Sequence, residues 1–489
     1  MYFPRLCLLL LLVGAVPVCG DDLPDHFLPF VDHHTLNTLV DQIGPNNGET
    51  FPLRYAVVAR YWNPASGPIF FYCGHELTLE YYINNTGLVW NWGRGFEAML
   101  VFSEHRFYGK SIPRGDHSYN NKTLGELLTT EQALADYVKL LHHIKIKYPF
   151  ADKAPIIAIG GFYGGMLATY FRLKHPDLIT GALASSAPVS MIPGMVPCHA
   201  FDYKLTQVFR HESAACEGAI RRSWPLLYSR ADTKPKAIGF FQSHRVCPEQ
   251  VAYGLGFFWE WMRETYIRLA MFNYKEPARR LTFLPPGGRW CRVGQACEVG
   301  CDSAFFCLFK APALSYNSIH CGTIFKYNQL ECIIGDTLKN VTRCLCFLFF
   351  PCLLTKESLL FLLNNIKKLG CLKRRNLKFN LQNKKLRISF LTFHWCLSKC
   401  VFPNKRKYDP WTSLGYLSPK TETVIPILIG ESAHQEDLAF GSSADRHDLI
   451  RAREQERRHV RKWIEEAERK EDTTLIFDPE MQKLDRDEF

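Results

Sequence analysis

Short apolar runs alternate with longer stretches of helical periodicity through the first part of the chain. The runs predict buried strands at residues 54–62, 69–73, 98–102, 155–159 and 181–188. Residues 130–147 place Leu134, Tyr137 and Leu141 on one stripe, which predicts an amphipathic helix with Thr130 as its N-cap. Strands that alternate with helices are typical of a mostly parallel sheet with helices on both faces.

The strand at 155–159 runs into closely spaced glycines, and a helical pattern follows. Gly160 and Gly164 frame a sequence that matches the nucleophile-elbow pattern Gly-x-Ser-x-Gly, except that Phe162 occupies the serine position. Such a turn holds its central residue at positive φ, and flanking side chains would collide with the strand and the helix. The backbone N–H of Tyr163 is the expected oxyanion-hole donor. The alternative is an ordinary glycine-rich turn with a core phenylalanine.

The elbow predicts an α/β-hydrolase fold, with a mostly parallel sheet, helices on both faces and an inserted helical cap domain. The pattern becomes mostly helical from Val196, returns to a strand at 423–429, and ends in an amphipathic helix from Ser443. We therefore divide the chain into a signal peptide at 1–20, a first hydrolase part at 21–195, a cap at 196–400, a second hydrolase part at 401–470 and a tail at 471–489.

Two residues of the second hydrolase part suit the remaining catalytic roles. Hydrolases of this fold carry their triad in the order nucleophile, acid, base, and Asp409 and His434 follow the elbow in that order. In such a triad the carboxylate orients the imidazole, and the imidazole takes the proton of the nucleophile. Without the chain order, Asp409 before Pro410 would be a turn former and His434 a solvated loop residue.

The N-terminal segment indicates secretion. Arg5, a short apolar run and small residues before Asp21 are typical of a cleaved signal peptide, and the run is too short for a membrane span. Three glycosylation sequons, at Asn84, Asn121 and Asn340, fit a glycoprotein of the secretory pathway that is secreted or delivered to the lysosome. In that oxidising route we expect the cysteines to pair.

The net charge of +11 has a local origin. Residues 367–387 contain nine lysines and arginines with no acidic residue between them, and removing these nine from +11 leaves +2. One basic segment on a near-neutral protein therefore explains the charge better than a nucleic-acid surface does.

Residues 291–400 are anomalous, because twelve of the eighteen cysteines fall there beside the basic tract. A disulfide-stapled cap is one interpretation. A zinc site is a weaker one, because the segment has no Cys-x-x-Cys pair, and we expect no metal. We favour a third for residues 340–398, translated non-coding sequence, because regular patterning fades there.

Several longer motifs carry a family resemblance, at residues 100–111, 131–136, 158–168, 187–189, 268–271, 408–411 and 432–434. With them the chain resembles the proline-specific serine exopeptidases. Within that family the resemblance is stronger to lysosomal Pro-X carboxypeptidase than to dipeptidyl peptidase II. The resemblance covers about residues 51–285 and 401–466. It implies cleavage after a penultimate proline, with release of the C-terminal residue or of an N-terminal dipeptide. It also implies that the protein needs no cofactor and that its partners are peptides with proline next to the terminal residue. A homodimer is possible.

Asp409 and His434 match the acid and base of that family, but the chain departs from its pattern at three places. Phe162 stands where the family has its serine. The loop before Asp409, at 404–407, lacks the glycine of the family's Asn-Gly, and the loop after it, at 412–416, is glycine-rich in the family but has Gly415 as its one glycine here. Ser185 and Ser186 lie off the elbow and are poor substitutes for the missing serine.

Three hypotheses follow. The first is a catalytically dead member of the family that still binds peptide ends, as a decoy or binding protein, because loss of a triad nucleophile removes orders of magnitude of rate. The second is an active peptidase whose sequence carries an error at Phe162, since one base change converts some serine codons to phenylalanine. The third, a basic glycoprotein that binds membranes or nucleic acid, is disfavoured because one tract supplies the charge.

Overall fold

The computed structural model describes residues 30–44, 48–191, 195–231, 233–243, 263, 266–267, 269–271, 273–274, 400–403, 408–416 and 424–476. The signal-peptide prediction, the sequon at Asn340 and the tract at 340–398 lie outside the described residues.

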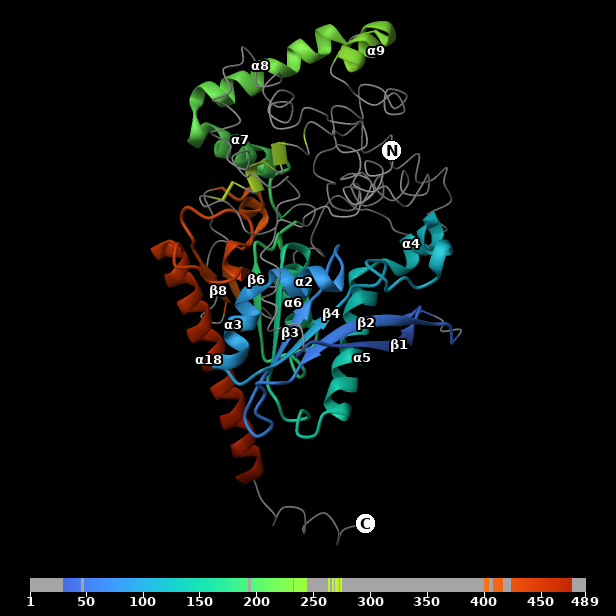
Figure 1. Ribbon diagram of the computed structural model, residues 1–489, viewed down its shortest axis with the longest axis vertical. Helices are drawn as coiled ribbons and strands as arrows, with labels where there is room; N and C mark the ends of the chain where they lie inside the picture. The colour runs from blue at the N-terminus through green and yellow to red at the C-terminus, as the bar shows by residue number, and fades with distance from the viewer. Residues whose placement is uncertain are drawn as a thin grey trace, which may run out of the picture.

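An eight-stranded sheet, in the order β1-β2-β4-β3-β5-β6-β7-β8, forms the centre of the described structure (Figure 1). β2 pairs antiparallel with both β1 and β4, and all the other pairs are parallel. The strands are β1 (Asp32–Leu39), β2 (Thr50–Val58), β3 (Ile69–Cys73), β4 (Met99–Ser103), β5 (Ile156–Gly161), β6 (Gly181–Ser185), β7 (Cys400–Pro403) and β8 (Val424–Ile427). The predicted mostly parallel sheet is confirmed, and the fold is that of the α/β-hydrolases.

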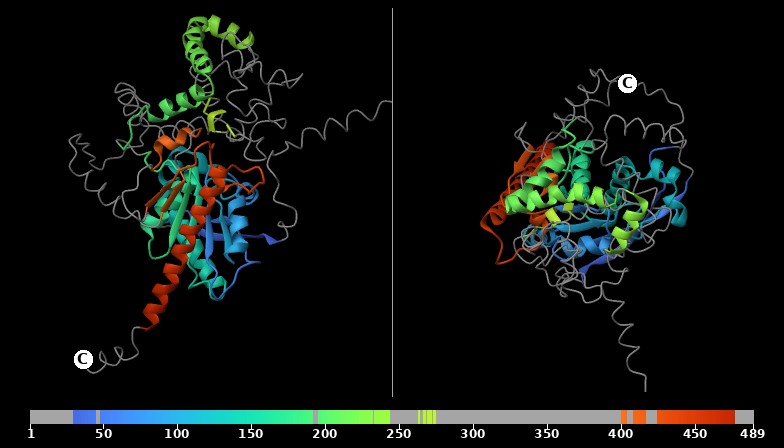
Figure 2. Two further views of the ribbon diagram at one scale, coloured as in Figure 1. Left: turned by 90° about the vertical axis from the view of Figure 1, so that its left-hand side faces the viewer. Right: turned by 90° about the horizontal axis from the view of Figure 1, so that it is seen from above.

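Helices cover both faces of this sheet, as the alternating pattern predicted. On one face, Tyr137 of α5 (Thr130–Lys147) and Phe171 of α6 (Phe162–Lys174) join the same apolar core as β3 and β5. The other face is covered by α2 (Leu79–Asn85), α3 (Gly87–Gly95) and α18 (His447–Ile476), with Trp463 of α18 packed against β6. In the left view of Figure 2, α18 lies in front of the sheet.

Three further helices belong to the segment predicted as a cap. They are α7 (Ala200–Glu212), α8 (Ala214–Arg230) and α9 (Lys234–Ser243), and they stand beyond one end of the sheet (Figures 1 and 2). Short 3-10 helices complete the described structure: η2 (Gly115–Tyr119), η4 (Pro410–Leu414) and η5 (Glu436–Leu438), together with the α-helix α4 (Asn121–Leu127).

Several predicted boundaries were wrong. The N-cap of α5 is Thr129, whose hydroxyl accepts the N–H of Gln132, and not Thr130. The C-terminal helix starts at His447, and not at Ser443, and it runs to Ile476. The strand β1 was missed, because its polar, half-exposed residues give no apolar run.

The expectation that cysteines pair is only partly met. Cys216 is disulfide-bonded, whereas Cys73 and Cys198 are free thiols. Cys73 lies in β3 and is fully buried, and burial raises the pKa of its thiol well above the ordinary value.

Three polar side chains directly after β4 are fully buried: Glu104, His105 and Arg106. The Glu104 carboxylate accepts the hydroxyl of Ser111 at 2.7 Å and the backbone N–H of Leu79 at 3.0 Å. These bonds fasten the loop after β4 to the start of α2. A buried carboxylate is tolerated here because donors satisfy its oxygens.

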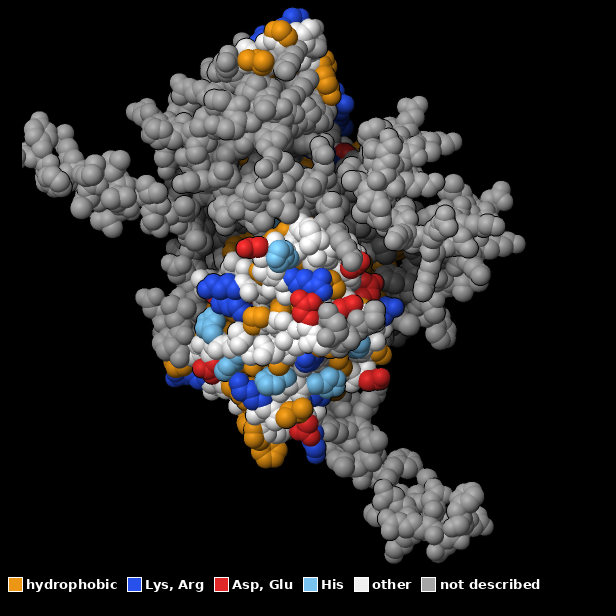
Figure 3. Space-filling model, turned by 90° about the vertical axis from the view of Figure 1, so that its right-hand side faces the viewer, with side chains coloured by type: hydrophobic (Ala, Val, Ile, Leu, Met, Phe, Trp, Pro, Cys, Tyr) orange, Lys and Arg blue, Asp and Glu red, His pale blue; other side chains and the backbone are white. Residues whose placement is uncertain are grey.

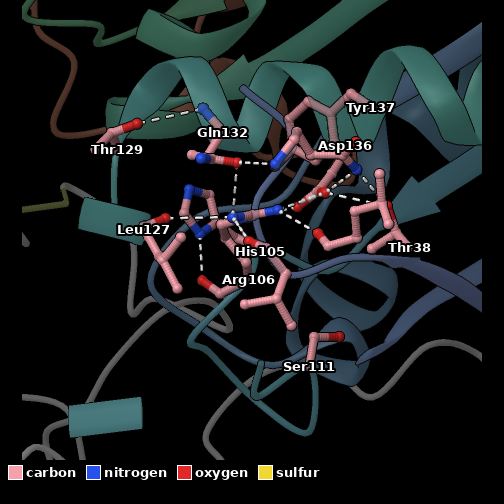
Figure 4. A network of polar contacts seen from close by, with 12 residues as sticks. Thr38, His105, Arg106, Ser111, Leu127, Thr129, Gln132, Asp136 and Tyr137 are labelled. Atoms are coloured by element: carbon pink, nitrogen blue, oxygen red, sulfur yellow. Dashed lines mark hydrogen bonds and ion pairs between the residues drawn. The ribbon is translucent and has the colours of Figure 1, made fainter. Parts of the chain in front are cut away.

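Arg106 is the centre of a buried ionic network (Figure 4). Its Nε and Nη2 donate to the two carboxylate oxygens of Asp136 at 2.6 and 2.7 Å. Its Nη1 donates to the carbonyl of Val40 at 2.9 Å and to Oε1 of Gln132 at 3.2 Å. The network thus ties the loop after β4 to α5 and to the end of β1, with both charges taken out of water.

The face on the right-hand side of Figure 1 carries Lys and Arg, Asp and Glu, and His side chains intermixed (Figure 3). None of the helices in the described part of the chain has an apolar stretch of the length a membrane span requires.

Replacing Asp136 by Asn should lower the free energy of unfolding by about 3–5 kcal/mol, because the Arg106 guanidinium then stays buried without a counter-charge. Urea titration of the purified protein measures the change. Glu49→Gln is the matched control, since it breaks the exposed pair with Arg114 and should cost less than about 1 kcal/mol. Equal losses in the two variants would show that the Arg106 network is not a main support of the fold.

His105 should make the protein less stable in acid. Burial lowers the pKa of His105 from its ordinary value of 6.5 to about 4. As the pH falls, His105 is therefore protonated near pH 6.5 in the unfolded chain but only near pH 4 in the folded chain. Stability is complete above pH 6.5 and falls as the pH drops from 6.5 to 4, by about 3 kcal/mol in all. Urea titrations across this range should show a shallower pH dependence in His105→Gln, and parallel curves would contradict the assignment.

Candidate functional site

The elbow forms where β5 ends at Gly161 and α6 begins at Phe162. Phe162 has a φ of +52°, the strained conformation expected of the central elbow residue. A Cβ on Gly160 would lie 2.2 Å from the carbonyl oxygen of Gly164, and one on Gly164 would lie 2.5 Å from the carbonyl oxygen of Cys73. Both framing glycines are therefore required by the close approach of α6 to β3 and β5.

Tyr163, the residue after the nucleophile position, lies in the first turn of α6, where helix geometry directs backbone N–H groups out of the helix end. Its side chain is buried, and its hydroxyl donates to Nε2 of His105 at 3.2 Å, whose Nδ1 donates to the carbonyl of Arg106 at 2.6 Å. Burial raises the pKa of the Tyr163 phenol well above its ordinary value. The phenol is thus a neutral packing group, and the oxyanion-hole role proposed for this residue rests on its backbone alone.

Asp409 and His434 meet, although 25 residues separate them. Nδ1 of His434 donates to Oδ2 of Asp409 at 3.0 Å, and both side chains are buried. Asp409 is also the N-cap of η4, and its Oδ1 accepts the backbone N–H of Trp411 at 3.1 Å. The carboxylate is therefore fixed by a helix end on one oxygen and by the imidazole on the other, even though the flanking loops depart from the family's pattern.

Residues of the segment 269–274 hold the backbone of His434, a contact that sequence reasoning missed. The N–H of His434 donates to the carbonyl of Met271 at 3.0 Å, and the hydroxyl of Tyr274 donates to the carbonyl of His434 at 2.7 Å. The Met271 sulfur also accepts the indole N–H of Trp411 at 3.1 Å. The motif at 268–271 was a signal that this segment matters, but not of what it touches.

Phe162 faces this pair. Its ring lies edge-on to the imidazole of His434, with centroids 5.6 Å apart, and edge-on to the indole of Trp411 at 4.6 Å. Phe201 of α7 packs on the other side of Trp411 at 4.6 Å. The elbow, the Asp409–His434 pair and the helix α7 therefore meet at one apolar cluster, whose other members include Ile267 and Leu414.

The two nearby serines are engaged elsewhere. The hydroxyl of Ser185 donates to Oδ1 of Asp437 at 2.6 Å, and the hydroxyl oxygen of Ser186 accepts the backbone N–H of Gln435 at 2.9 Å. Both side chains are fully buried. Their bonds agree with the expectation that neither replaces the missing nucleophile.

Two of the three predicted glycosylation sequons, at Asn84 and Asn121, lie within the described residues. Asn84 is half-buried near the end of α2, and Thr86 of its sequon is buried with its hydroxyl bonded to the carbonyl of Tyr82 at 2.7 Å. Asn121 is the first residue of α4. Within the described residues, no group of three or more His, Cys, Asp or Glu side chains is arranged to hold a metal ion.

Comparison with known proteins gives the family. The profile of the family described as Serine carboxypeptidase S28 matches residues 38–280 and 378–456. The human lysosomal Pro-X carboxypeptidase is 32% identical over 443 residues, which cover 87% of this chain and 86% of that protein. Prolyl carboxy peptidase like protein 5 of Caenorhabditis elegans is 29% identical over 462 residues, covering 89% of this chain and 90% of that protein.

Among solved structures, an epoxide hydrolase of Vigna radiata aligns with 32% of this chain and 40% of its own, at 15% identity and a TM-score of 0.22. The family match spans more than half of the sequence and includes the elbow, Asp409 and His434. The chain belongs to the serine carboxypeptidase S28 family.

Proposed function

We propose that this chain is a catalytically inactive member of its family that binds peptides with proline next to the terminal residue. The observation that carries the proposal is the position of Phe162, at positive φ on the elbow with its ring 5.6 Å from that of His434. A benzyl group has no lone pair to attack a carbonyl and no proton for the imidazole to take. The acid–base pair therefore has no nucleophile to activate.

The rest of the site supports binding without turnover. The Asp409–His434 pair and the glycines of the elbow are kept, while an apolar cluster of Phe162, Trp411 and Phe201 joins the hydrolase domain to α7. Trp411 and Phe201 are buried, whereas Phe162 is partly exposed, and its apolar ring suits contact with the ring of a proline, since burial of apolar area drives such contacts. We place the protein in the secretory pathway, either secreted or in the lysosome, in keeping with the lysosomal relatives.

The native protein should not react with a fluorophosphonate probe, which labels only activated serine hydroxyls. Phe162→Ser should become labelled, because it returns a hydroxyl to the elbow beside His434. Gel fluorescence after probe treatment measures both results. Phe162→Ala is the matched control, since it removes the ring without adding a hydroxyl, and it should remain unlabelled by the probe.

Labelling of the native protein would reject the inactive-enzyme proposal. It would favour the second candidate, an active peptidase whose recorded sequence has an error at Phe162, which the intact Asp409–His434 pair also suits. Sequencing the transcript across Gly160–Gly165 distinguishes the two, because a serine codon at position 162 would make the phenylalanine an artefact.

A fluorescent peptide ending in Pro-Phe should bind the native protein about tenfold more tightly than the same peptide ending in Ala-Phe, because two additional carbons of the proline ring are buried. Fluorescence polarisation titrations measure both dissociation constants. Equal affinities for the two peptides, or no binding of either, would contradict proline-directed binding and leave only the loss of catalysis.

A further inference from the structure

The side chain of Gln435 contacts the ring nitrogen of His434 that would accept the proton of a nucleophile. Its Nε2 is 3.1 Å from Nε2 of His434, while the other ring nitrogen is bonded to Asp409 at 3.0 Å. The side-chain oxygen of Gln435 points the other way, toward the elbow, where a Cβ added to Gly161 would meet it at 2.3 Å. The amide thus stands between the base and the backbone of the nucleophile turn.

The direction of this hydrogen bond follows from the partner on the opposite side of the ring. A carboxylate only accepts, so Nδ1 of His434 carries the proton in its bond to Asp409. In a neutral imidazole the second nitrogen, Nε2, is then the acceptor, and it is the lone pair on this atom that takes the proton of a nucleophile. The Gln435 amide N–H donates to that lone pair.

The backbone holds Gln435 in this place. The residue has a φ of +53°, a left-handed conformation that is uncommon for a residue with a side chain. Its N–H donates to the buried hydroxyl oxygen of Ser186 at 2.9 Å, and Ser186 itself has a φ of +47°. Two residues with left-handed backbones, Ser186 directly after β6 and Gln435 at the N-cap of η5, therefore hold the amide against the imidazole.

We propose that Gln435 is a positioning residue that occupies the base, so that the site carries a second barrier to catalysis besides Phe162. The inference rests on the proposed function, because it assumes that His434 is the base of a triad without its nucleophile. Burial gives the reason, since His434 is only 3% exposed and its Nε2 needs a donor that Phe162 lacks. Gln435 supplies the donor, and a serine returned to position 162 has to compete with it.

The test compares Phe162→Ser with the double variant Phe162→Ser, Gln435→Ala in their second-order rate of fluorophosphonate labelling. The double variant should react about tenfold faster, which corresponds to the loss of one competing hydrogen bond. Phe162→Ser, Gln435→Glu is the matched control, because it keeps the side-chain length but presents a charged acceptor to Nε2. Equal rates for Phe162→Ser with and without Gln435→Ala, zero included, overturn the proposal.

A second measurement does not depend on labelling. In the protein with native Phe162 and selectively ¹⁵N-labelled histidine, Gln435→Ala should move the His434 Nε2 resonance and leave Nδ1 in place. A general loss of structure would move both resonances, and an unmoved Nε2 would overturn the contact. Labelling of the native chain, in contrast, would sink the proposed function while the Nε2 resonance still reports on Gln435.

Discussion

The closeness of two backbones at the elbow constrains everything else in the site. Helix α6 starts so near β5 and β3 that neither Gly160 nor Gly164 has room for a Cβ. The chain can make this crossing only if the residue between them turns at positive φ, and that residue is Phe162. Phe162 adopts this φ although a bulky side chain makes it costly, so the turn forms here with a benzyl group in place of a hydroxyl. The backbone of the turn therefore does not require a serine at its centre.

A second constraint is that Asp409 and His434 come from the loops after different strands and must be fixed separately. Asp409 is immobilised by capping η4, whereas His434 is held through its own backbone by Met271 and Tyr274. The latter two residues belong to the segment that follows the cap helices. The ring of His434 is then bonded at both nitrogens, to Asp409 and to Gln435. Such an imidazole is a satisfied buried group, which explains how the pair persists structurally without a nucleophile beside it.

The loop after β4 shows the same use of buried polar groups away from the chemistry. Glu104, His105 and Arg106 are consecutive and fully buried, and each has its own set of partners. Two of the motifs that carried the family resemblance, 100–111 and 131–136, meet in the Arg106–Asp136 pair. Their similarity to the family therefore reflects support of the fold beneath the site, with His105 as the link to Tyr163.

The sequence by itself determined the alternation of buried strands with helices, the glycine-framed elbow, and the selection of Asp409 and His434 as candidates, because apolar periodicity, glycine spacing and chain order are local or linear properties. It missed β1, whose polar residues make a strand only through pairing with β2, and it placed the N-cap of α5 one residue late. Only the tertiary structure decided that Gln435 faces the imidazole, that Met271 holds it, and that Arg106 pairs with Asp136. These contacts join residues through side-chain direction and backbone strain, which no repeating pattern along the chain encodes.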